Sequence, residues 1–144
     1  MKKVLAQEVD ANTFSPYGTL IDVPSTYGRY DFSVELNNAR LHAQPNLLLA
    51  HIPASAMPIE IKRMERHLHS SQTFFPLNVS RYLVVVSPSK DDNTPQIEHL
   101  EAFIVSGLQG INYNIGTWHY PLTALDRDAS FAALVWEDGS SSDT

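Results

Sequence analysis

The chain has 144 residues and a formal net charge of -6, with hydrophobic side chains at 43% and charged side chains at 18%. A chain of this length and composition is expected to form one globular domain, residues 1–144, with a core of its own. The acidic balance argues against nucleic acid as a partner, although one local cation can still bind a small carboxylate. The sequence contains no cysteine, which excludes disulfide bonds, thiolate catalysis and cysteine-ligated zinc.

The N-terminus begins with the basic residues Lys2 and Lys3, as a signal peptide does. The apolar run after Lys3 is too short for a signal peptide, since Gln7 and Glu8 end it. The longest apolar stretches, at 47–50 and 83–86, are far too short to cross a bilayer. We therefore expect a cytoplasmic protein with no membrane partner. The polar tail, residues 138–144, is expected to be frayed.

Short apolar stretches alternate with turn residues at a spacing of about ten residues, which is typical of an all-β sandwich or barrel. In chain order, the first element is a short helical turn at 10–14, which either Asp10 or Asn12 can cap. Strands are then predicted at residues 17–23, 31–36, 47–52, 59–67, 73–77, 82–87, 100–105, 111–115 and 130–136. No linker and no repeat interrupts this series.

The predicted strand at 59–67 carries a candidate ionisable pair. Alternate residues of a strand share a face, so Glu65 and His67 are expected on the same face as Ile59 and Ile61. We interpret that face as the inner one because it begins with two isoleucines. Ionisable groups placed inside a barrel are costly unless they have partners, and such a cost is typical of a functional site.

A second candidate segment runs from Gly110 to His119. Gly110 and Gly116 bracket a predicted strand, and Gly116 can supply the positive φ of a tight turn. His119 then lies at the start of the next strand, three residues past that turn.

These two segments resemble the two sequence motifs of the cupins. Gly116-Thr117-Trp118-His119 matches the Gly-x-x-His of the second motif. Glu65-x-His67-x4-Gln72 has the spacing of the first motif, with Glu and Gln at its first and last positions. A fuller set, spread over residues 10–136, resembles the ureidoglycolate lyases: Phe14-Ser15-Pro16-Tyr17-Gly18, Glu65-Arg66-His67, Gln72, Phe74, Pro76, Leu100-x-Ala102-Phe103-Ile104, Gln109-Gly110-Ile111-Asn112-Tyr113, Trp118-His119 and Pro121-Leu122.

The resemblance implies an all-β cupin fold, a double-stranded β-helix or jelly-roll barrel. It also implies an enzyme that cleaves (S)-ureidoglycolate to glyoxylate and urea in the allantoin branch of purine degradation, working as a homodimer. We expect His67, His119 and Glu65 to be catalytic. Gln72, Tyr113 and Trp118 are expected to contact the substrate.

The same resemblance implies a divalent metal, either Ni, Mn, Fe or Zn, bound by Glu65, His67, Gln72 and His119. Glu65 and Gln72 replace the usual cupin His and Glu, which weakens the case for tight binding, so a metal-free site is an open alternative. His69 offers a literal His67-x-His69 pair, but Gln72 would then follow too soon for the cupin spacing.

Plainer interpretations stand beside each of these assignments. The two histidines can be satisfied by core hydrogen bonds, and Glu65 can pair with Arg63 or Arg66. Tyr113 and Trp118 can be core residues. The whole domain can instead be a sensor that binds a small carboxylate, a degenerate barrel, or an amidohydrolase that releases ammonia from ureidoglycolate.

The expected homodimer has a physical basis as well. The apolar stretches at 47–50 and 83–86 could form an isologous contact, or simply be strands of the monomer core. Arg66 alternates away from Glu65 and His67, so we expect it to point out of its own barrel, either towards a dimer partner or into a surface pair.

Overall fold

The computed structural model describes residues 2–144, and nearly all of its regular structure is β-strand. The short helical elements are α1 (Ala11–Phe14), η1 (Ser33–Glu35), η2 (Ile97–His99) and η3 (Ser141–Asp143). The strands are β1 (Gln7–Glu8), β2 (Gly18–Asp22), β3 (Gln44–Ile52), β4 (Gln72–Pro76), β5 (Arg81–Ser87), β6 (Glu101–Ser106), β7 (Gln109–Tyr113), β8 (Trp118–His119), β9 (Thr123–Leu125) and β10 (Ala129–Glu137).

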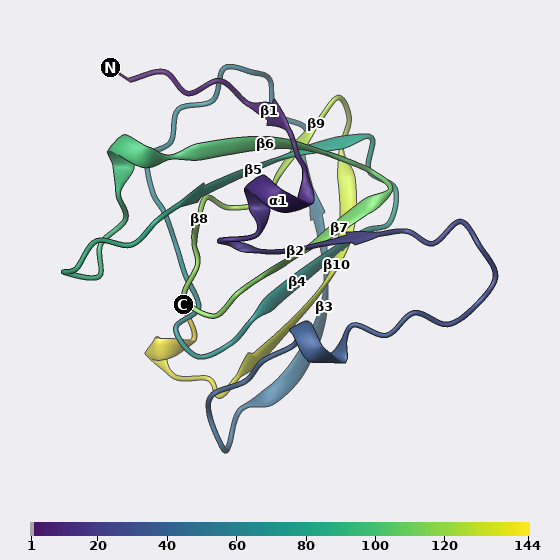
Figure 1. The fold of residues 1–144 in the computed structure, drawn as a ribbon, viewed down its shortest axis with the longest axis vertical. Coiled ribbons are helices and arrows are strands. Elements are labelled where there is room, and N and C mark those ends of the chain that lie inside the picture. The colour runs from purple at the N-terminus through teal and green to yellow at the C-terminus, as the bar shows by residue number, and fades with distance from the viewer. Residues whose placement is uncertain (1) are drawn as a thin grey trace.

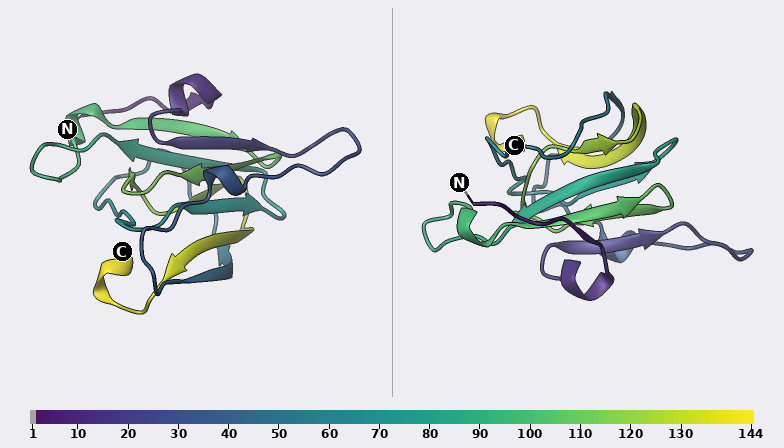
Figure 2. Two further views of the ribbon diagram at one scale, coloured as in Figure 1. Left: turned by 60° about the horizontal axis from the view of Figure 1, so that its bottom comes forward. Right: turned by 90° about the horizontal axis from the view of Figure 1, so that it is seen from above.

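The strands form two sheets. Sheet A has the order β1-β6-β5-β8, with β9 also paired to β5, and sheet B has the order β2-β7-β4-β10-β3. All neighbours are antiparallel except β1 and β6. The long loop between β2 and η1 extends away from both sheets (Figures 1 and 2). The all-β, double-stranded β-helix predicted from the sequence is confirmed.

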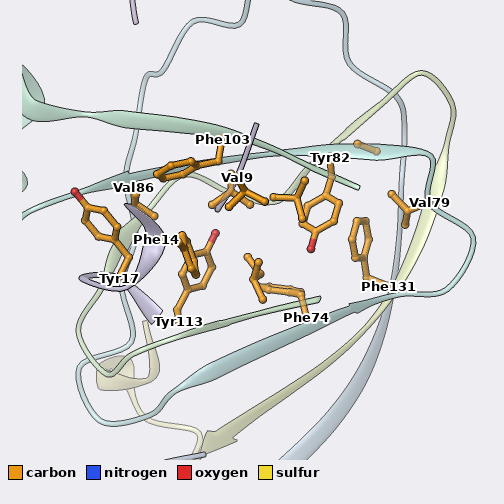
Figure 3. Close-up of a cluster of buried hydrophobic side chains, with 14 of the residues drawn as sticks. Val9, Phe14, Tyr17, Phe74, Val79, Tyr82, Val86, Phe103, Tyr113 and Phe131 are labelled. Atoms are coloured by element: carbon orange, nitrogen blue, oxygen red, sulfur yellow. The ribbon is translucent and has the colours of Figure 1, made fainter. Parts of the chain in front are cut away.

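The main core lies between the two sheets and is rich in aromatic rings (Figure 3). On β5, Tyr82, Val84 and Val86 belong to this core, and from sheet B Phe131 packs edge-on against Tyr82 with ring centroids 5.1 Å apart. The alternate β5 residue Leu83 belongs to a second, smaller cluster on the outer face of sheet A. Sheet A is therefore covered on both faces.

Most of the predicted elements are confirmed. The N-terminal helical turn is α1, and its cap is Asp10, whose side chain accepts hydrogen bonds from the backbone N–H groups of Asn12 and Thr13. The strands predicted at 17–23, 47–52, 73–77, 82–87, 100–105, 111–115 and 130–136 correspond to β2, β3, β4, β5, β6, β7 and β10.

Two predicted strands are wrong. Residues 31–36 contain η1 instead, and the side-chain amide of buried Asn112 donates to the Glu35 carbonyl, which holds this turn against sheet B. Residues 59–67 form no strand beyond a single bridge at Glu65. Ile59 and Ile61 pack in the second cluster, on the outer face of sheet A. They are apolar because of this contact, and they do not point into the barrel interior.

The tail is not frayed, contrary to the prediction. Arg40, whose side chain is 14% exposed, forms ion pairs with Asp138 and Asp143 and donates to the Trp136 carbonyl. These contacts hold η3 against the body of the protein, although the composition of the tail gives no sign of them. Within residues 2–144, no helix has the length and apolar content needed to cross a membrane.

The close approach of β2 to β7 makes one position intolerant of any side chain. A Cβ atom added at Gly18 would lie 1.8 Å from the Asn112 carbonyl oxygen. We expect Gly18→Ala to lower the free energy of unfolding by about 2–4 kcal/mol, because β2 must move away from β7. Urea denaturation measures this loss. Thr19→Ala on the same strand should cost less than about 1 kcal/mol, and an equal loss in both variants would contradict the steric explanation.

Candidate active site

His119 and Tyr113 join the two sheets across the interior. His119 lies on β8 opposite Val86 of β5, so its ring enters the space between the sheets, where the residue is 2% exposed. Tyr113, at the end of β7 in sheet B, is equally buried at 2% exposure. The two rings stack with centroids 4.3 Å apart and planes inclined by 15°. One residue from each sheet thus forms the floor of the site.

Gln72 lies next to Tyr113 on sheet B. The two residues are directly opposed in the β4–β7 pairing, so both side chains point to the inner face. Gln72 is 9% exposed, yet its Oε1 atom has no hydrogen-bond partner. The sheet register therefore brings an amide oxygen alongside the stacked rings.

Glu65 and His67 come from the segment that connects β3 to β4. Glu65 exchanges two backbone hydrogen bonds with His119, at 2.8 and 2.9 Å, and its Oε1 lies 3.7 Å from His119 Nε2. The turn at Gly116, with the predicted positive φ of 79°, donates its N–H to the His67 carbonyl at 2.8 Å. These bonds place the His67 ring beside that of His119, with centroids 5.6 Å apart.

Backbone carbonyls set the proton positions on both imidazoles. Nδ1 of His119 lies 2.9 Å from the Thr117 carbonyl oxygen, and Nδ1 of His67 lies 2.7 Å from that of Asp143. A carbonyl oxygen only accepts, so each Nδ1 must carry a hydrogen. In the neutral form of each ring, Nε2 therefore holds a lone pair that can take a proton.

Four buried polar atoms of these residues have no partner: Nε2 of His67, Oε1 of Gln72, the hydroxyl of Tyr113 and Nε2 of His119. Leaving a buried donor or acceptor unpaired costs about 1–3 kcal/mol each. Such atoms are rare in folded proteins, and here they gather on neighbouring residues. A cluster of this kind is expected where a polar ligand completes the hydrogen bonds.

Burial also shifts the acid–base properties of the two stacked rings. Desolvation lowers the pKa of His119 to about 4, helped by neighbouring His67 and opposed by the hydrogen bond to Thr117. Burial, and secondarily the charge of Glu65, raises the pKa of Tyr113 far above its ordinary value. Near neutral pH, His119 is therefore an uncharged base and Tyr113 a protonated hydrogen-bond donor.

The structure brings together five of the six residues predicted for the site, and Trp118 is the exception. Trp118 alternates with His119 on β8 and faces away from it, with its indole N–H donating to the Ser89 hydroxyl. Arg66 lies over the Trp118 ring at 4.4 Å, so its outward direction agrees with the sequence, but its partner belongs to the same chain. The Asp143 carbonyl could not be predicted from the sequence, because every residue has a backbone carbonyl.

The same residues do not fit the predicted metal centre. A preformed site needs at least three ligands that converge on one point. Within the described chain, residues 2–144, no three His, Asp or Glu side chains do so, and the rings of His67 and His119 lie stacked at 28°. We therefore derive no step through a metal, and metal binding stays a prediction.

Comparison with known proteins gives a consistent result. The model of the family described as ureidoglycolate lyase matches residues 1–144. A ureidoglycolate lyase of Pseudomonas savastanoi is 32% identical over 146 aligned residues, covering 93% of this chain and 83% of that protein. A ureidoglycolate lyase of Burkholderia cepacia is 47% identical over 80 residues, covering 55% of this chain and 44% of that one.

Among solved structures, RmlC from Streptococcus suis, in complex with dTDP-D-xylose, matches with a TM-score of 0.41 and 10% sequence identity. The match covers 69% of this chain and 46% of that chain.

The buried, neutral state of His119 predicts how stability depends on pH. The folded pKa of about 4 lies below the ordinary value of 6.5, so the unfolded chain takes up the proton first. The stability that the protein has with His119 neutral is fully present above pH 6.5, and it is lost as the pH falls towards 4 and the unfolded chain binds the proton. Between pH 7 and pH 5 the loss amounts to about 2 kcal/mol for a fully desolvated group.

Urea denaturation at the two pH values measures this loss. We expect His119→Gln to lack it, whereas His51→Gln, at an exposed position, should keep the full wild-type dependence. Equal pH dependence in wild type and His119→Gln would mean that His119 is not the group responsible.

Proposed function

The chain belongs to the ureidoglycolate lyase family, and from that premise we propose that it cleaves (S)-ureidoglycolate into glyoxylate and urea. The observation that carries the proposal is the group of four unpaired polar atoms beside an uncharged, buried histidine. The proposal includes a place for this step in allantoin degradation and a location in the cytoplasm, which rest on the family.

The reaction defines what the site must do. One carbon of the substrate carries a carboxylate, a hydroxyl group and a ureido nitrogen. The hydroxyl O–H bond breaks, the C–O bond becomes the carbonyl of glyoxylate, the C–N bond breaks and the leaving nitrogen gains a proton. The reaction needs a base near the hydroxyl group and an acid near the nitrogen.

His119 is suited to be the base. Its Nδ1–H is held by the Thr117 carbonyl, so the free Nε2 lone pair can accept the hydroxyl proton. The imidazolium that forms gains a counter-charge from Glu65, whose carboxylate lies 3.7 Å away. Glu65 thereby compensates for the burial that keeps His119 neutral in the resting enzyme.

His67 is suited to be the acid. Its ring is less buried than that of His119, and its Nδ1–H stays bonded to the Asp143 carbonyl whether the ring is neutral or cationic. In the cationic ring, which carries a hydrogen on both nitrogens, the proton that leaves is therefore the one on Nε2, and it goes to the departing urea nitrogen. Proton exchange with solvent then restores both histidines to their starting states.

Gln72 and Tyr113 are suited to orient the substrate. The free Oε1 of Gln72 is an acceptor and matches the N–H donors of the ureido group. The Tyr113 hydroxyl remains protonated, so it donates to an anionic or developing oxygen of the substrate. Each unpaired atom of the site then has a partner of the opposite hydrogen-bonding type.

Product analysis on the purified protein tests this function. We expect urea and glyoxylate from (S)-ureidoglycolate above the spontaneous rate, and we expect kcat to fall about 100-fold or more in His67→Ala and His119→Ala. His69→Ala is the matched control and should change kcat by less than about 3-fold, since His69 is held through its backbone carbonyl, which accepts from the Ala39 N–H and is kept in the variant.

The same assay distinguishes the alternatives. Release of ammonia in place of urea would identify an amidohydrolase, and binding of glyoxylate without turnover would identify a sensor or a degenerate barrel. Activity lost to a chelator and restored by Ni, Mn, Fe or Zn would establish the metal-dependent alternative. A larger effect at His69 than at His67 would mean that the motif register is wrong.

We also propose that the chain forms a homodimer through the outer face of sheet B. Leu47 and Leu49 on β3 are 73% and 75% exposed there, beside an apolar hollow of about 310 Å³ that Leu134 and Phe75 help to line. The alternative stretch at 83–86 is not available, because its side chains are at most 4% exposed inside the monomer.

Light scattering at micromolar concentration tests the dimer. The chain mass is 16.1 kDa, and we expect roughly twice that value in solution. Replacing Leu47 and Leu49 by Asp should give a folded monomer, because two charges cannot be buried unpaired in the contact. Leu108→Asp, at an exposed turn, should leave the dimer intact. A wild-type mass near that of one chain at every concentration would contradict the proposal.

A further inference from the structure

We infer that Arg40 and Asp143 are positioning residues, which act through the Asp143 carbonyl to keep a hydrogen on His67 Nδ1, so that Nε2 is the nitrogen that exchanges a proton during the reaction. This inference deepens the proposed function and rests on it for the role of His67. Neither residue belongs to the group that would contact substrate.

The side chain of Asp143 is held from three sides. Arg40 Nη1 lies 2.6 Å from its Oδ1. The backbone N–H groups of Asp138 and Gly139 donate to its two oxygens at 3.1 and 2.8 Å. The carboxylate is therefore the anchor of η3, and its own backbone carbonyl is free to point elsewhere.

Arg40 ties this anchor to the segment that carries His67. Its Nη1 also pairs with Asp138 at 3.1 Å, and its Nη2 donates to the Trp136 carbonyl at 2.9 Å. The residue before it, Ala39, donates its N–H to the carbonyl of His69 at 2.8 Å. The guanidinium thus links the end of β10 to the η3 turn, and the neighbouring backbone N–H of Ala39 links this region to the stretch that follows His67.

The Asp143 carbonyl completes the link at 2.7 Å from His67 Nδ1. Without that acceptor, a neutral imidazole can place its hydrogen on either nitrogen, and only the form with Nδ1–H leaves Nε2 able to accept and return a proton. Holding the ring in one tautomer is what the buried carboxylate does for the histidine of a serine-protease triad, where loss of that orientation severely reduces kcat. Here the backbone carbonyl of Asp143 has the role of that carboxylate, and the ion pair between the Arg40 and Asp143 side chains holds the carbonyl in place.

Long-range proton–nitrogen NMR spectra of protein labelled with ¹⁵N at its six histidines report the tautomer directly. We expect neutral His67, assigned by the signals lost in His67→Gln, to carry its proton on Nδ1 in the wild type. In Arg40→Ala and Asp143→Ala the signals should move towards a mixture of both tautomers. Arg40→Lys should give an intermediate result, because an ammonium keeps the charge but lacks the planar fork of donors that the guanidinium presents to the carboxylates and the carbonyl.

The kinetic readout should follow the tautomer. We expect kcat in Arg40→Ala to fall about 10-fold or more, as for other groups that orient a functional histidine, with KM changed by less than about 2-fold. Arg81→Ala is the matched control: it also removes an arginine ion-paired to an aspartate, Asp126 at 2.8 Å, and should leave both the tautomer and kcat unchanged.

Two outcomes would overturn the inference. One is an unchanged His67 tautomer in folded Arg40→Ala and Asp143→Ala, and the other is an equal loss of kcat in Arg81→Ala. If the alanine variants do not fold, Arg40→Lys and Asp143→Asn carry the same comparison. The tautomer is read without substrate, so a protein that lacks lyase activity but shows the expected spectra would separate failure of the proposed function from failure of this inference.

Discussion

The stacked pair of Tyr113 and His119 is the contact on which the rest of the site depends. Each ring comes from a different sheet, and their centroids lie 4.3 Å apart, so the inner faces must approach closely at this end of the barrel. The same stack removes His119 from water and lowers its pKa to about 4. The packing of the two sheets therefore also determines the protonation state of His119, because a looser barrel would hydrate the imidazole and raise its pKa towards the ordinary value.

The polar atoms left unpaired around this stack are a cost that the remaining core must offset. A protein selected only for stability would have apolar side chains at these positions. This chain has one at the next inward-facing position of β4. Phe74, two residues after Gln72 on the same face of β4, packs edge-on against both Tyr113 and Phe131. The change from Phe74 to Gln72 along one strand marks where the apolar core ends and the proposed binding site begins.

The sequence predicts the strands well where alternation marks one buried face, as along β10, and where a continuous apolar run marks two buried faces, as along β5. It fails at 59–67, since Ile59 and Ile61 alternate correctly but pack on the outer face of sheet A. Glu65, His67 and His119 could be placed in one site only through their motif spacing, while Trp118 was placed with them although it faces the other way. The roles of Arg40 and Asp143 depend on contacts between residues 103 positions apart, which no local pattern encodes.

Because sheet A is covered on both faces, its strands should open less readily than the connections outside it. β5 is buried from Tyr82 to Ser87 and pairs with three strands, so its amides should be among the slowest to exchange with deuterated solvent. His119 pairs directly with this strand. His67 lies instead in the segment between β3 and β4, which has few backbone hydrogen bonds to either sheet. Local opening of the connection would separate the two histidines at a free energy below that of global unfolding. In the proposed mechanism, the acid His67 could thus move away while the base His119 remains in the most protected part of the fold.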